Sequence, residues 1–330
     1  MKRPGVAVAI VLLLGLGAAD LGAQAQQPTG LSRIGLLPFG SASNEYDRSL
    51  VEAFRLGLRE IGVVENRDVA LDVAWTSTEA ELSSAAGDLV SRGAKLLIPF
   101  GTSASLAAKR QASTVPILFI SVGNPVGIGL VGSLSRPGGN VTGFSDILLD
   151  LSGKYVQFAR EFSKPQAPIF YLWYRAWGDG ENRLRATEQA TQAVGLKLRA
   201  TNIGDLAELD EAMATMKKSG ATVVVVQPSP FTYRHRARFV DVAAKYGLAA
   251  IFAFPPAARA GAIVAYGPDY ADLCRRAASY ADRILKGTKP ADLAVQEPIK
   301  LDLIVNMKTA KTLGLVVPES LRLQATETLE

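Results

Sequence analysis

The sequence has very few of the residues from which most catalytic and metal sites are built. Its 330 residues include one cysteine, Cys274, and one histidine, His235. A single cysteine excludes an intramolecular disulfide, and we interpret Cys274 as a small packed residue, with a reactive thiol as the alternative. A His/Cys metal cluster is excluded as well, and a nucleophile with its base is hard to assemble. The sequence therefore predicts no metal, no cofactor and no enzyme activity.

Signatures of nucleotide and nucleic-acid binding are also missing. Neither a GxGxxG motif nor a P-loop follows any predicted strand. The net charge of +5 is modest, and nucleic-acid binding would need a concentrated basic face, so no nucleic-acid partner is expected. The densest basic run, residues 234–238, is interpreted as a solvated helix surface. Within it, His235 shares a helical stripe with Phe239 and Val242, which favours a structural histidine over a catalytic one.

Long apolar runs are confined to the N-terminus. Residues 6–19 are apolar apart from glycines, follow a Lys-Arg pair and precede an Ala-Gln-Ala site that ends at Ala25. This pattern predicts a secretory signal peptide, residues 1–25, and export of the mature chain. A membrane anchor is the alternative, but the run is shorter than the roughly 20 residues that span a bilayer.

The rest of the chain has the composition of a globular protein. Hydrophobic residues make up 48% and charged residues 20% of the sequence, and its length suits two domains rather than one. From Arg33 onward, strand patterns alternate with helix patterns, which predicts an α/β fold with parallel sheets. Strands are predicted at 34–39, 69–75, 95–100, 116–120, 140–144, 169–174, 197–202, 222–227, 249–254 and 262–266, and helices at 46–61, 79–92, 104–111, 152–162, 180–194, 205–219 and 269–286.

One stretch, residues 115–145, is central to the functional interpretation. Its apolar start, residues 116–120, predicts a strand that is buried on both faces. The strand ends before Ser121, and Asn124 follows in the loop. Ligands of open parallel sheets bind beyond the carboxyl ends of the strands, so both side chains are placed where a small molecule would bind. A surface loop without a ligand is the alternative.

Polar and aromatic residues follow several other predicted strands in the same way. A ligand pocket needs apolar walls with a few convergent polar groups, and these residue types suit it, although each also suits ordinary capping or packing. Free backbone N–H groups at the start of the helix after Gly101 attract an anion. We therefore expect Thr102 and Ser103 to hold a carboxylate and Asp269 to meet an amine. The predicted ligand-binding residues are Ser41, Thr102, Ser103, Ser121, Asn124, Trp173, Ser229, Phe254, Tyr266 and Asp269.

Several segments in one order carry a resemblance to a known family. They are RIGLLPFG at 33–40, AFRLGLREIG at 53–62, FGTSASLAAKR at 100–110, GNPVGIGLVGSLSRPGGNVTGFS at 123–145, YGPDYADLCRRAASYADRILKGTKPADL at 266–293 and IVNMKTAKTLGLVVPESL at 304–321. Together they resemble the ABC_sub_bind family of ABC transporter substrate-binding proteins, which has tryptophan-binding-like members. The resemblance covers nearly the whole mature chain.

The resemblance implies a type 1 periplasmic-binding fold. In this fold, two Rossmann-like, doubly wound α/β lobes are joined by a hinge and close over one small ligand. The implied division of the chain is discontinuous. Residues 26–145 and 267–290 would form the N-terminal lobe, and residues 146–266 and 291–330 the C-terminal lobe.

The resemblance also implies a function, the periplasmic solute-binding component of an ABC import system. Such a protein delivers a small-molecule solute, here an aromatic amino acid or a related carboxylate, to a permease and its ATPase, and we expect it to be a monomer. The alternative is the ligand-sensing module of a periplasmic signalling system. Two departures from the family pattern concern the ligand: many relatives carry an aspartate where Asn124 stands, and an Asn-Pro pair follows the strand that here ends Trp173-Tyr174.

Overall fold

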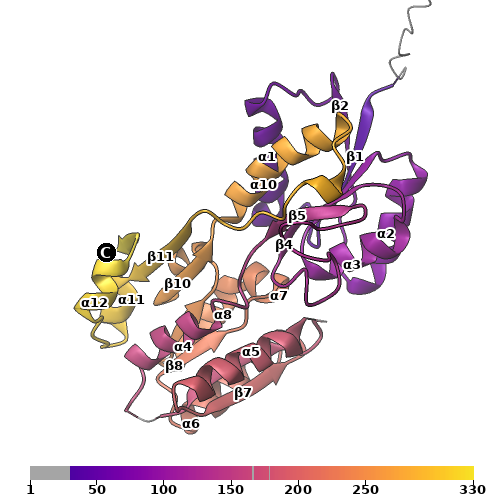
Figure 1. The fold of residues 1–330 in the computed structure, drawn as a ribbon. Coiled ribbons are helices and arrows are strands. Elements are labelled where there is room, and N and C mark those ends of the chain that lie inside the picture. Colours follow the sequence, from indigo (N-terminus) through magenta and orange to yellow (C-terminus); the bar gives the residue numbers. More distant parts are fainter. Residues whose placement is uncertain (1–29, 166, 178) are drawn as a thin grey trace, which may run out of the picture. The chain divides into compact units, whose positions relative to one another are not determined.

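Two β-sheets with helices packed against them make up the fold (Figure 1). The computed structural model describes residues 30–165, 167–177 and 179–330, and residues from Leu31 to Glu330 form one unit. The predicted signal peptide, residues 1–25, lies outside the described residues. In the described part of the chain, no helix combines the length and the apolar character needed to cross a bilayer. The α/β class predicted from the alternating pattern is confirmed.

The first sheet is parallel throughout, with the strand order β2-β1-β3-β4-β5. Its strands are β1 (Ser32–Leu37), β2 (Val69–Val73), β3 (Leu96–Pro99), β4 (Ile117–Val122) and β5 (Val141–Ser145). Helices α1 (Glu45–Glu60), α2 (Glu79–Ser91) and α3 (Thr102–Gln111) connect them. The short apolar strands β3 and β4 are buried on both faces, as expected for a parallel sheet that helices cover.

The second sheet has the order β12-β11-β10-β9-β8-β6-β7, and its pairs are parallel except for β10 with β11. Its strands are β6 (Ile169–Tyr174), β7 (Leu198–Ile203), β8 (Val223–Val226), β9 (Ala249–Phe252), β10 (Val264–Pro268), β11 (Leu301–Asn306) and β12 (Glu327–Leu329). Its helices are α4 (Ser152–Glu161), α5 (Gly180–Ala193), α6 (Leu209–Lys218), α7 (Pro230–Arg234), α8 (Arg236–Lys245), α9 (Pro256–Arg259), α11 (Met307–Thr312) and α12 (Glu319–Gln324). Four consecutive valines form β8, the most uniform part of the core.

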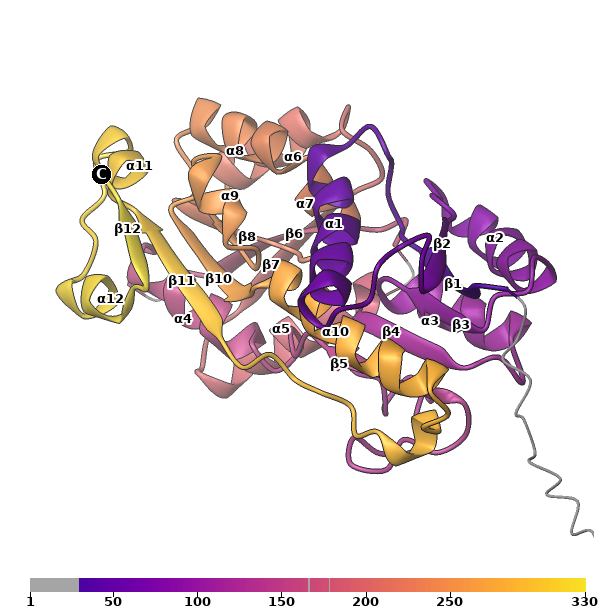
Figure 2. The same cartoon turned by 90° about the horizontal axis from the view of Figure 1, so that it is seen from above.

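Helix α10 (Tyr270–Leu285) begins directly after β10 of the second sheet but packs on the first. It packs against α1 and also contacts β4 (Figure 2). The two backbones come very close at Gly57, where an added Cβ would lie 2.0 Å from the carbonyl oxygen of Arg275. Glycine is required there because any side chain would separate the helices.

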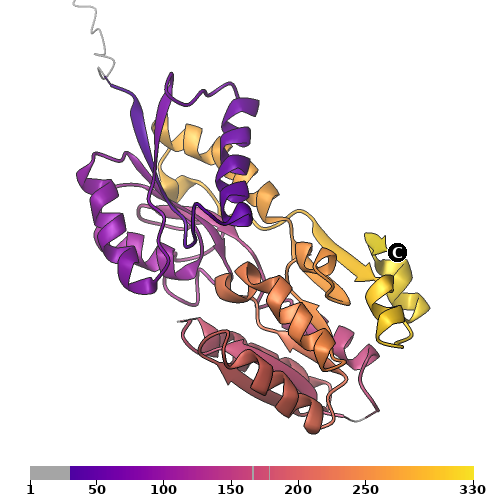
Figure 3. The same cartoon turned by 180° about the vertical axis from the view of Figure 1, so that it is seen from behind.

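After α10 and the short 3-10 helix η1 (Pro290–Asp292), the chain runs beside β5 before it returns to the second sheet. The backbone N–H of Gln296 donates to the carbonyl of Gly143 over 2.9 Å, and the N–H of Ser145 donates to the carbonyl of Gln296 over 2.8 Å. The chain then enters β11 (Figure 3). It therefore passes between the sheets three times: after Ser145, after Pro268 and before Leu301.

Some element boundaries differ from the predicted ones for identifiable reasons. The strand predicted at 140–144 is β5, which begins at Val141, and the preceding Asn140 holds the turn before it, with its side chain donating to the carbonyls of Ala112 and Val115 over 2.7 Å each. The helix predicted from 205 begins at Leu209. Asp205 is held in a local turn in which its Oδ1 accepts from backbone N–H groups two and three residues on.

Candidate ligand-binding site

A cavity of about 100 Å³ lies where strands of both sheets end. Residues in or just after β1, β3 and β4 line it from the first sheet, among them Phe39, Thr102 and Ser121. Residues after β6 and β8 line it from the second sheet, among them Trp177 and Ser229. This is the end of a parallel sheet at which ligands usually bind.

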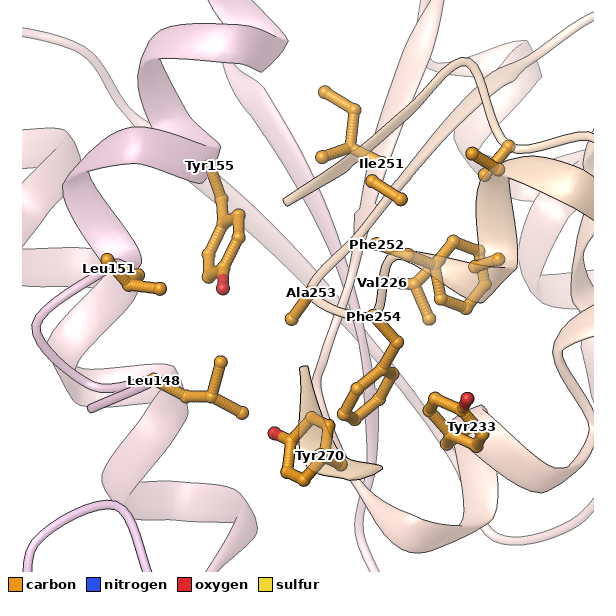
Figure 4. Close-up of a cluster of buried hydrophobic side chains, with 14 of the residues drawn as sticks. Leu148, Leu151, Tyr155, Val226, Tyr233, Ile251, Phe252, Ala253, Phe254 and Tyr270 are labelled. Atoms are coloured by element: carbon orange, nitrogen blue, oxygen red, sulfur yellow. The ribbon is translucent and has the colours of Figure 1, made fainter. Parts of the chain in front are cut away.

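Aromatic rings form much of the cavity wall. The ring centroid of Tyr233 lies 3.8 Å from that of Tyr46 and 4.2 Å from that of Phe254. Phe254 packs in turn against Tyr270 at 5.5 Å (Figure 4). Aromatic side chains offer a large and rigid apolar surface. The wall therefore suits a ligand with a flat apolar part.

A buried cluster of charged side chains borders this wall. Arg183 of α5 and Asp146 both line the cavity, and they are only 4% and 2% exposed. The Nε of Arg183 donates to Oδ2 of the buried Asp179 over 3.0 Å, and its guanidinium lies 5.1 Å from the centre of the Trp177 ring. Within the described residues, Nη1 of Arg183 has no hydrogen-bond partner.

Arg183 remains a cation despite this burial. Removal from water lowers the pKa of Arg183, but the charges of Asp146 and Asp179 more than offset this effect, so its pKa lies above the ordinary value. A buried cation that keeps its charge and has one unused donor is a site for an anionic group.

Ser121 reaches the charged cluster through an unusual backbone conformation. Its φ is 63°, in the left-handed region, at the point where the register of β4 with β5 shifts. Such a conformation costs a non-glycine residue about 1–3 kcal/mol. The Ser121 hydroxyl donates to Oδ2 of Asp146 over 2.9 Å, and the backbone N–H of Leu148 donates to Oδ1 over 3.1 Å. The Asp146 carboxylate is therefore held in place through both of its oxygens.

The start of α3 forms another part of the wall. Gly101 precedes this helix with a φ of 86°, a conformation that glycine adopts without strain. Thr102 is buried beside the cavity, whereas the Ser103 hydroxyl donates to the Glu79 carboxylate over 2.7 Å. The first N–H groups of a helix lack partners within it, so this end of α3 is open to an anion as well.

Helices α1 and α7 meet at the edge of the cavity. Asp47 accepts hydrogen bonds from the backbone N–H of Ser41 over 2.8 Å and from Nε of Arg234 over 3.3 Å. Nη2 of Arg234 also donates to the carbonyl of Phe39 over 3.3 Å. Next to this ion pair lies the ring contact of Tyr46 with Tyr233. The contact connects the first sheet with the second.

Five of the predicted ligand-binding residues lie together in the cavity wall. Ser229 is among them, but its hydroxyl accepts from the backbone N–H of Thr232 over 3.1 Å and caps α7. Whether these side chains bind a ligand stays a prediction. The five residues are Thr102, Ser103, Ser121, Ser229 and Phe254.

The other predicted residues lie outside this wall. The Ser41 hydroxyl contacts that of Ser43 at 2.8 Å, and Oδ1 of Asn124 accepts from the backbone N–H of Gly127 over 2.8 Å. Trp173 packs beside Gly180. The Ser41 and Asn124 side chains therefore have hydrogen-bond partners within three residues along the chain.

The side chains of Tyr266 and Asp269 also contact residues outside the cavity wall. The Tyr266 ring packs edge-on against Phe158 at 5.4 Å. Asp269 is the N-cap of α10, where its Oδ1 accepts from the N–H groups of Ala271 and Asp272 over 2.9 and 3.2 Å. Asp269 borders a different pocket. The predicted contact of Asp269 with an amine stays a prediction.

Asp146, Trp177 and Arg183 line the cavity but are not among the predicted ligand-binding residues. A signal for Arg183 was present in the helical spacing, because it shares a stripe with Thr187 and Thr191, and all three are buried. A charged residue on the buried face of a helix is rare unless it is paired or functional. Asp146 gave no such signal, since it stands alone after a strand.

Across residues 30–165, 167–177 and 179–330, no group of three His, Cys, Asp or Glu side chains is placed to hold a metal ion. Cys274 lines the cavity but is fully buried, and burial raises its pKa well above the ordinary value. A thiol in this state is a poor nucleophile.

Comparison with solved structures shows the same fold in other proteins. A conserved domain protein from Vibrio cholerae has a TM-score of 0.83 at 23% identity, over 91% of this chain and 100% of that one. An ABC domain in complex with L-Trp from Streptococcus pneumonia has a TM-score of 0.81 at 21% identity, over the same shares of the two chains. The predicted type 1 periplasmic-binding fold is confirmed.

Similarity in sequence identifies the family. The tyrosine-binding protein of Clostridioides difficile is 23% identical over 267 residues, which are 80% of this chain and 76% of that protein. The profile of the family described as ABC transporter substrate binding protein matches residues 46–329. This match covers most of the sequence and confirms the resemblance seen in its motifs. The chain belongs to the family of ABC transporter substrate binding proteins.

Proposed function

We propose that this protein binds an aromatic amino acid or a related carboxylate in its cavity and delivers it to an ABC permease and its ATPase. The observation that carries the proposal is a cavity that combines an aromatic wall with the buried guanidinium of Arg183. An apolar pocket with a few convergent polar groups is the usual form of a small-molecule site. Two similar proteins are described as tyrosine-binding and as an L-Trp complex, which supports the aromatic class.

The proposal includes the location and state of the protein. We infer that it acts in the periplasm after removal of residues 1–25, that it works as a monomer and that it releases its ligand unchanged, without acting as an enzyme. The apolar N-terminal run and the family support this inference.

We also infer that the two sheets are the centres of two lobes that close on the ligand. The lobes would comprise residues 26–145 with 267–290, and residues 146–266 with 291–330. The hinge would lie at the three chain crossings, near residues 144–146, 266–269 and 301–306. A ligand that touches both lobes favours the closed state by its difference in affinity for the two states. Small-angle scattering should then show a smaller radius of gyration with ligand, and identical profiles would argue against closure.

The ligand class is tested on protein that has been unfolded, stripped of ligand by dialysis and refolded. Thermal unfolding is measured with each common amino acid and with aromatic acids, followed by titration calorimetry. A ligand at 100 times its Kd should add about 2.7 kcal/mol to the free energy of unfolding, which is a clear rise in Tm. If aliphatic or charged amino acids stabilise the protein and aromatic ones do not, the proposed class is wrong.

A further inference from the structure

The guanidinium of Arg183 is the least satisfied charged group in the cavity wall. Its Nε is occupied by Asp179, whereas Nη1 has no hydrogen-bond partner among the described residues, although the side chain is only 5% exposed. An unmade hydrogen bond of a buried charged group is costly, so such a group normally has a partner. Because Arg183 lines the cavity, a ligand is the partner that the site lacks.

Arg183 is oriented by contacts that do not involve the ligand. The ion pair with Asp179 holds one edge of the guanidinium, and the Trp177 ring at 5.1 Å covers it. Gly123 leaves room on another side: a Cβ there would lie 2.9 Å from Nη2 of Arg183 and 3.1 Å from Oδ1 of Asp146. Arg183 and Asp146, which both line the cavity, therefore lie close to each other beside Gly123, and no side chain at position 123 separates them.

The charges near this point restrict the chemistry of the ligand. Two buried carboxylates, Asp146 and Asp179, accompany one buried guanidinium, so the cluster carries a net negative charge. A dianion such as a phosphate would be repelled by the carboxylates, and a simple cation would be repelled by the guanidinium of Arg183. A group with one negative and one positive charge side by side satisfies both requirements.

We propose that Arg183 and Asp146 together bind the charged end of a zwitterionic α-amino acid. The guanidinium of Arg183 donates to the ligand carboxylate, and the Asp146 carboxylate accepts from the ligand ammonium. Asp179, Ser121 and Gly123 act as positioning residues. This inference rests on the proposed function, because the aromatic wall would hold the side chain of the same ligand. The ligand carboxylate then lies at Arg183 of α5, whereas the sequence predicts it at the start of α3.

The first test uses the wild-type protein and four forms of one ligand. For the tighter binder of L-tryptophan and L-tyrosine, titration calorimetry compares the amino acid, its primary amide, its decarboxylated amine and its deaminated acid. The amide, the amine and the acid should each bind at least about tenfold more weakly, because each removes one charge that the cluster recognises. Equal affinity of the amino acid and its amide, or of the amino acid and its deaminated acid, would overturn the inference.

The second test assigns each charge to its residue. Arg183→Gln should make the amino acid and its amide bind alike, and Asp146→Asn should make the amino acid and its deaminated acid bind alike. Arg175→Gln is the control, since Arg175 forms an exposed ion pair with Glu208 away from the cavity and should keep wild-type discrimination. If Thr102→Val, and not Arg183→Gln, removes the preference for the carboxylate, the α3 end holds it and the inference is wrong.

Folding and the ligand class are checked separately. Arg183→Gln leaves the Asp179 carboxylate without its ion-pair partner, so the double variant Arg183→Gln/Asp179→Asn, which removes both charges, is measured alongside it. Far-UV circular dichroism and Tm show whether each variant folds. If neither L-tryptophan nor L-tyrosine binds the wild type, the proposed ligand class fails. If one of them binds and the charge preferences are absent, only the role of Arg183 and Asp146 fails.

Discussion

His235 lies at the junction of two short helices, where it is both the C-cap of α7 and the N-cap of α8. The sequence predicted one helical stripe through this residue, but the backbone departs from helical geometry there, with φ −99° and ψ 16°. Its ring packs at 4.9 Å from that of Phe231. Partial burial, followed by the charge of Arg234, lowers the pKa of His235 below its ordinary 6.5.

The first prediction concerns pH. Below about pH 6.5 the unfolded chain binds a proton at His235 before the folded chain does, so acid favours unfolding at this site. Wild type should lose stability between pH 7.5 and 5 relative to His235→Gln, and the two should have the same pH dependence above about pH 8. Urea unfolding across this range measures the difference. Because the sequence has a single histidine, NMR titration of its ring protons gives the pKa directly, and a value above 6.5 would contradict this account.

The second prediction concerns the single thiol. Cys274 is fully buried, and burial raises its pKa, so the thiolate is scarce at neutral pH. A thiol-reactive chromogenic disulfide should not label the native protein at pH 8 within the time in which it labels the protein in 6 M guanidinium chloride completely. Rapid labelling of native, ligand-free protein that saturating ligand prevents would mean that the cavity opens widely enough to expose α10.

Single residues also show what the sequence alone could and could not predict about the site. Thr102 and Ser121 were predicted because strand ends meet at one edge of a parallel sheet, which is a property of the fold. Asn124 and Asp269 have the same residue chemistry, but local backbone N–H groups occupy their side-chain oxygens. The choice between a cap and a ligand contact depends on backbone geometry that residue type does not specify.

At the scale of elements, α1 and α10 pack so closely at Gly57 that a single substitution tests the contact. The third prediction is that Gly57→Ala lowers the free energy of unfolding by at least about 1–3 kcal/mol, the usual cost of overpacking, because its Cβ would lie 2.0 Å from the Arg275 carbonyl. Urea unfolding measures the change. A stability equal to that of wild type would show that the helices are not packed this closely.

Gly87→Ala is the matched control for this prediction. Gly87 lies inside α2, and the nearest atom to an added Cβ is 3.7 Å away, which is an ordinary contact. Alanine loses less conformational freedom than glycine on folding and is a better helix former, so this variant should gain about 0.4–1 kcal/mol. Opposite changes in the free energy of unfolding at these two helical glycines would separate the effect of packing from that of helix propensity.

Elements with strong periodic patterns were predicted well, and those without them were not. The alternation of buried strands with amphipathic helices placed β1 to β10 in the correct order along the chain. The strand β12 could not be predicted, because it has three residues, and only its pairing with β11 identifies it. The same holds for residue Gln296, whose backbone pairs with β5 although the chain there has no strand pattern.

At the scale of the whole molecule, the contact of α1 with α7 joins the parts built on the two sheets. The fourth prediction is that Arg234→Met weakens ligand binding by up to about tenfold, because the ion pair with Asp47 and the bond to the Phe39 carbonyl stabilise the state in which the parts touch. Titration calorimetry measures the affinity, and small-angle scattering should show a larger radius of gyration for the ligand-free variant.

Arg238→Met is the control for this effect. Arg238 pairs with Asp210 at 3.0 Å within the second-sheet part, and its side chain is largely exposed. Such surface pairs contribute little to stability, so affinity and scattering should match those of wild type. If Arg234→Met behaves like this control, the contact at the cavity edge does not influence closure.

The three crossings have a consequence for synthesis on the ribosome. Residues 31–145 contain all five strands of the first sheet, but α10, which covers α1 around Gly57, is made only after β6 to β10 have left the ribosome. The apolar face of α1 in the nascent chain therefore stays uncovered until α10, which lies far downstream in the sequence, has been synthesised. A stop codon after residue 145 should yield a fragment that binds a hydrophobic dye and is digested rapidly, and a separately supplied α10 segment should reduce both effects.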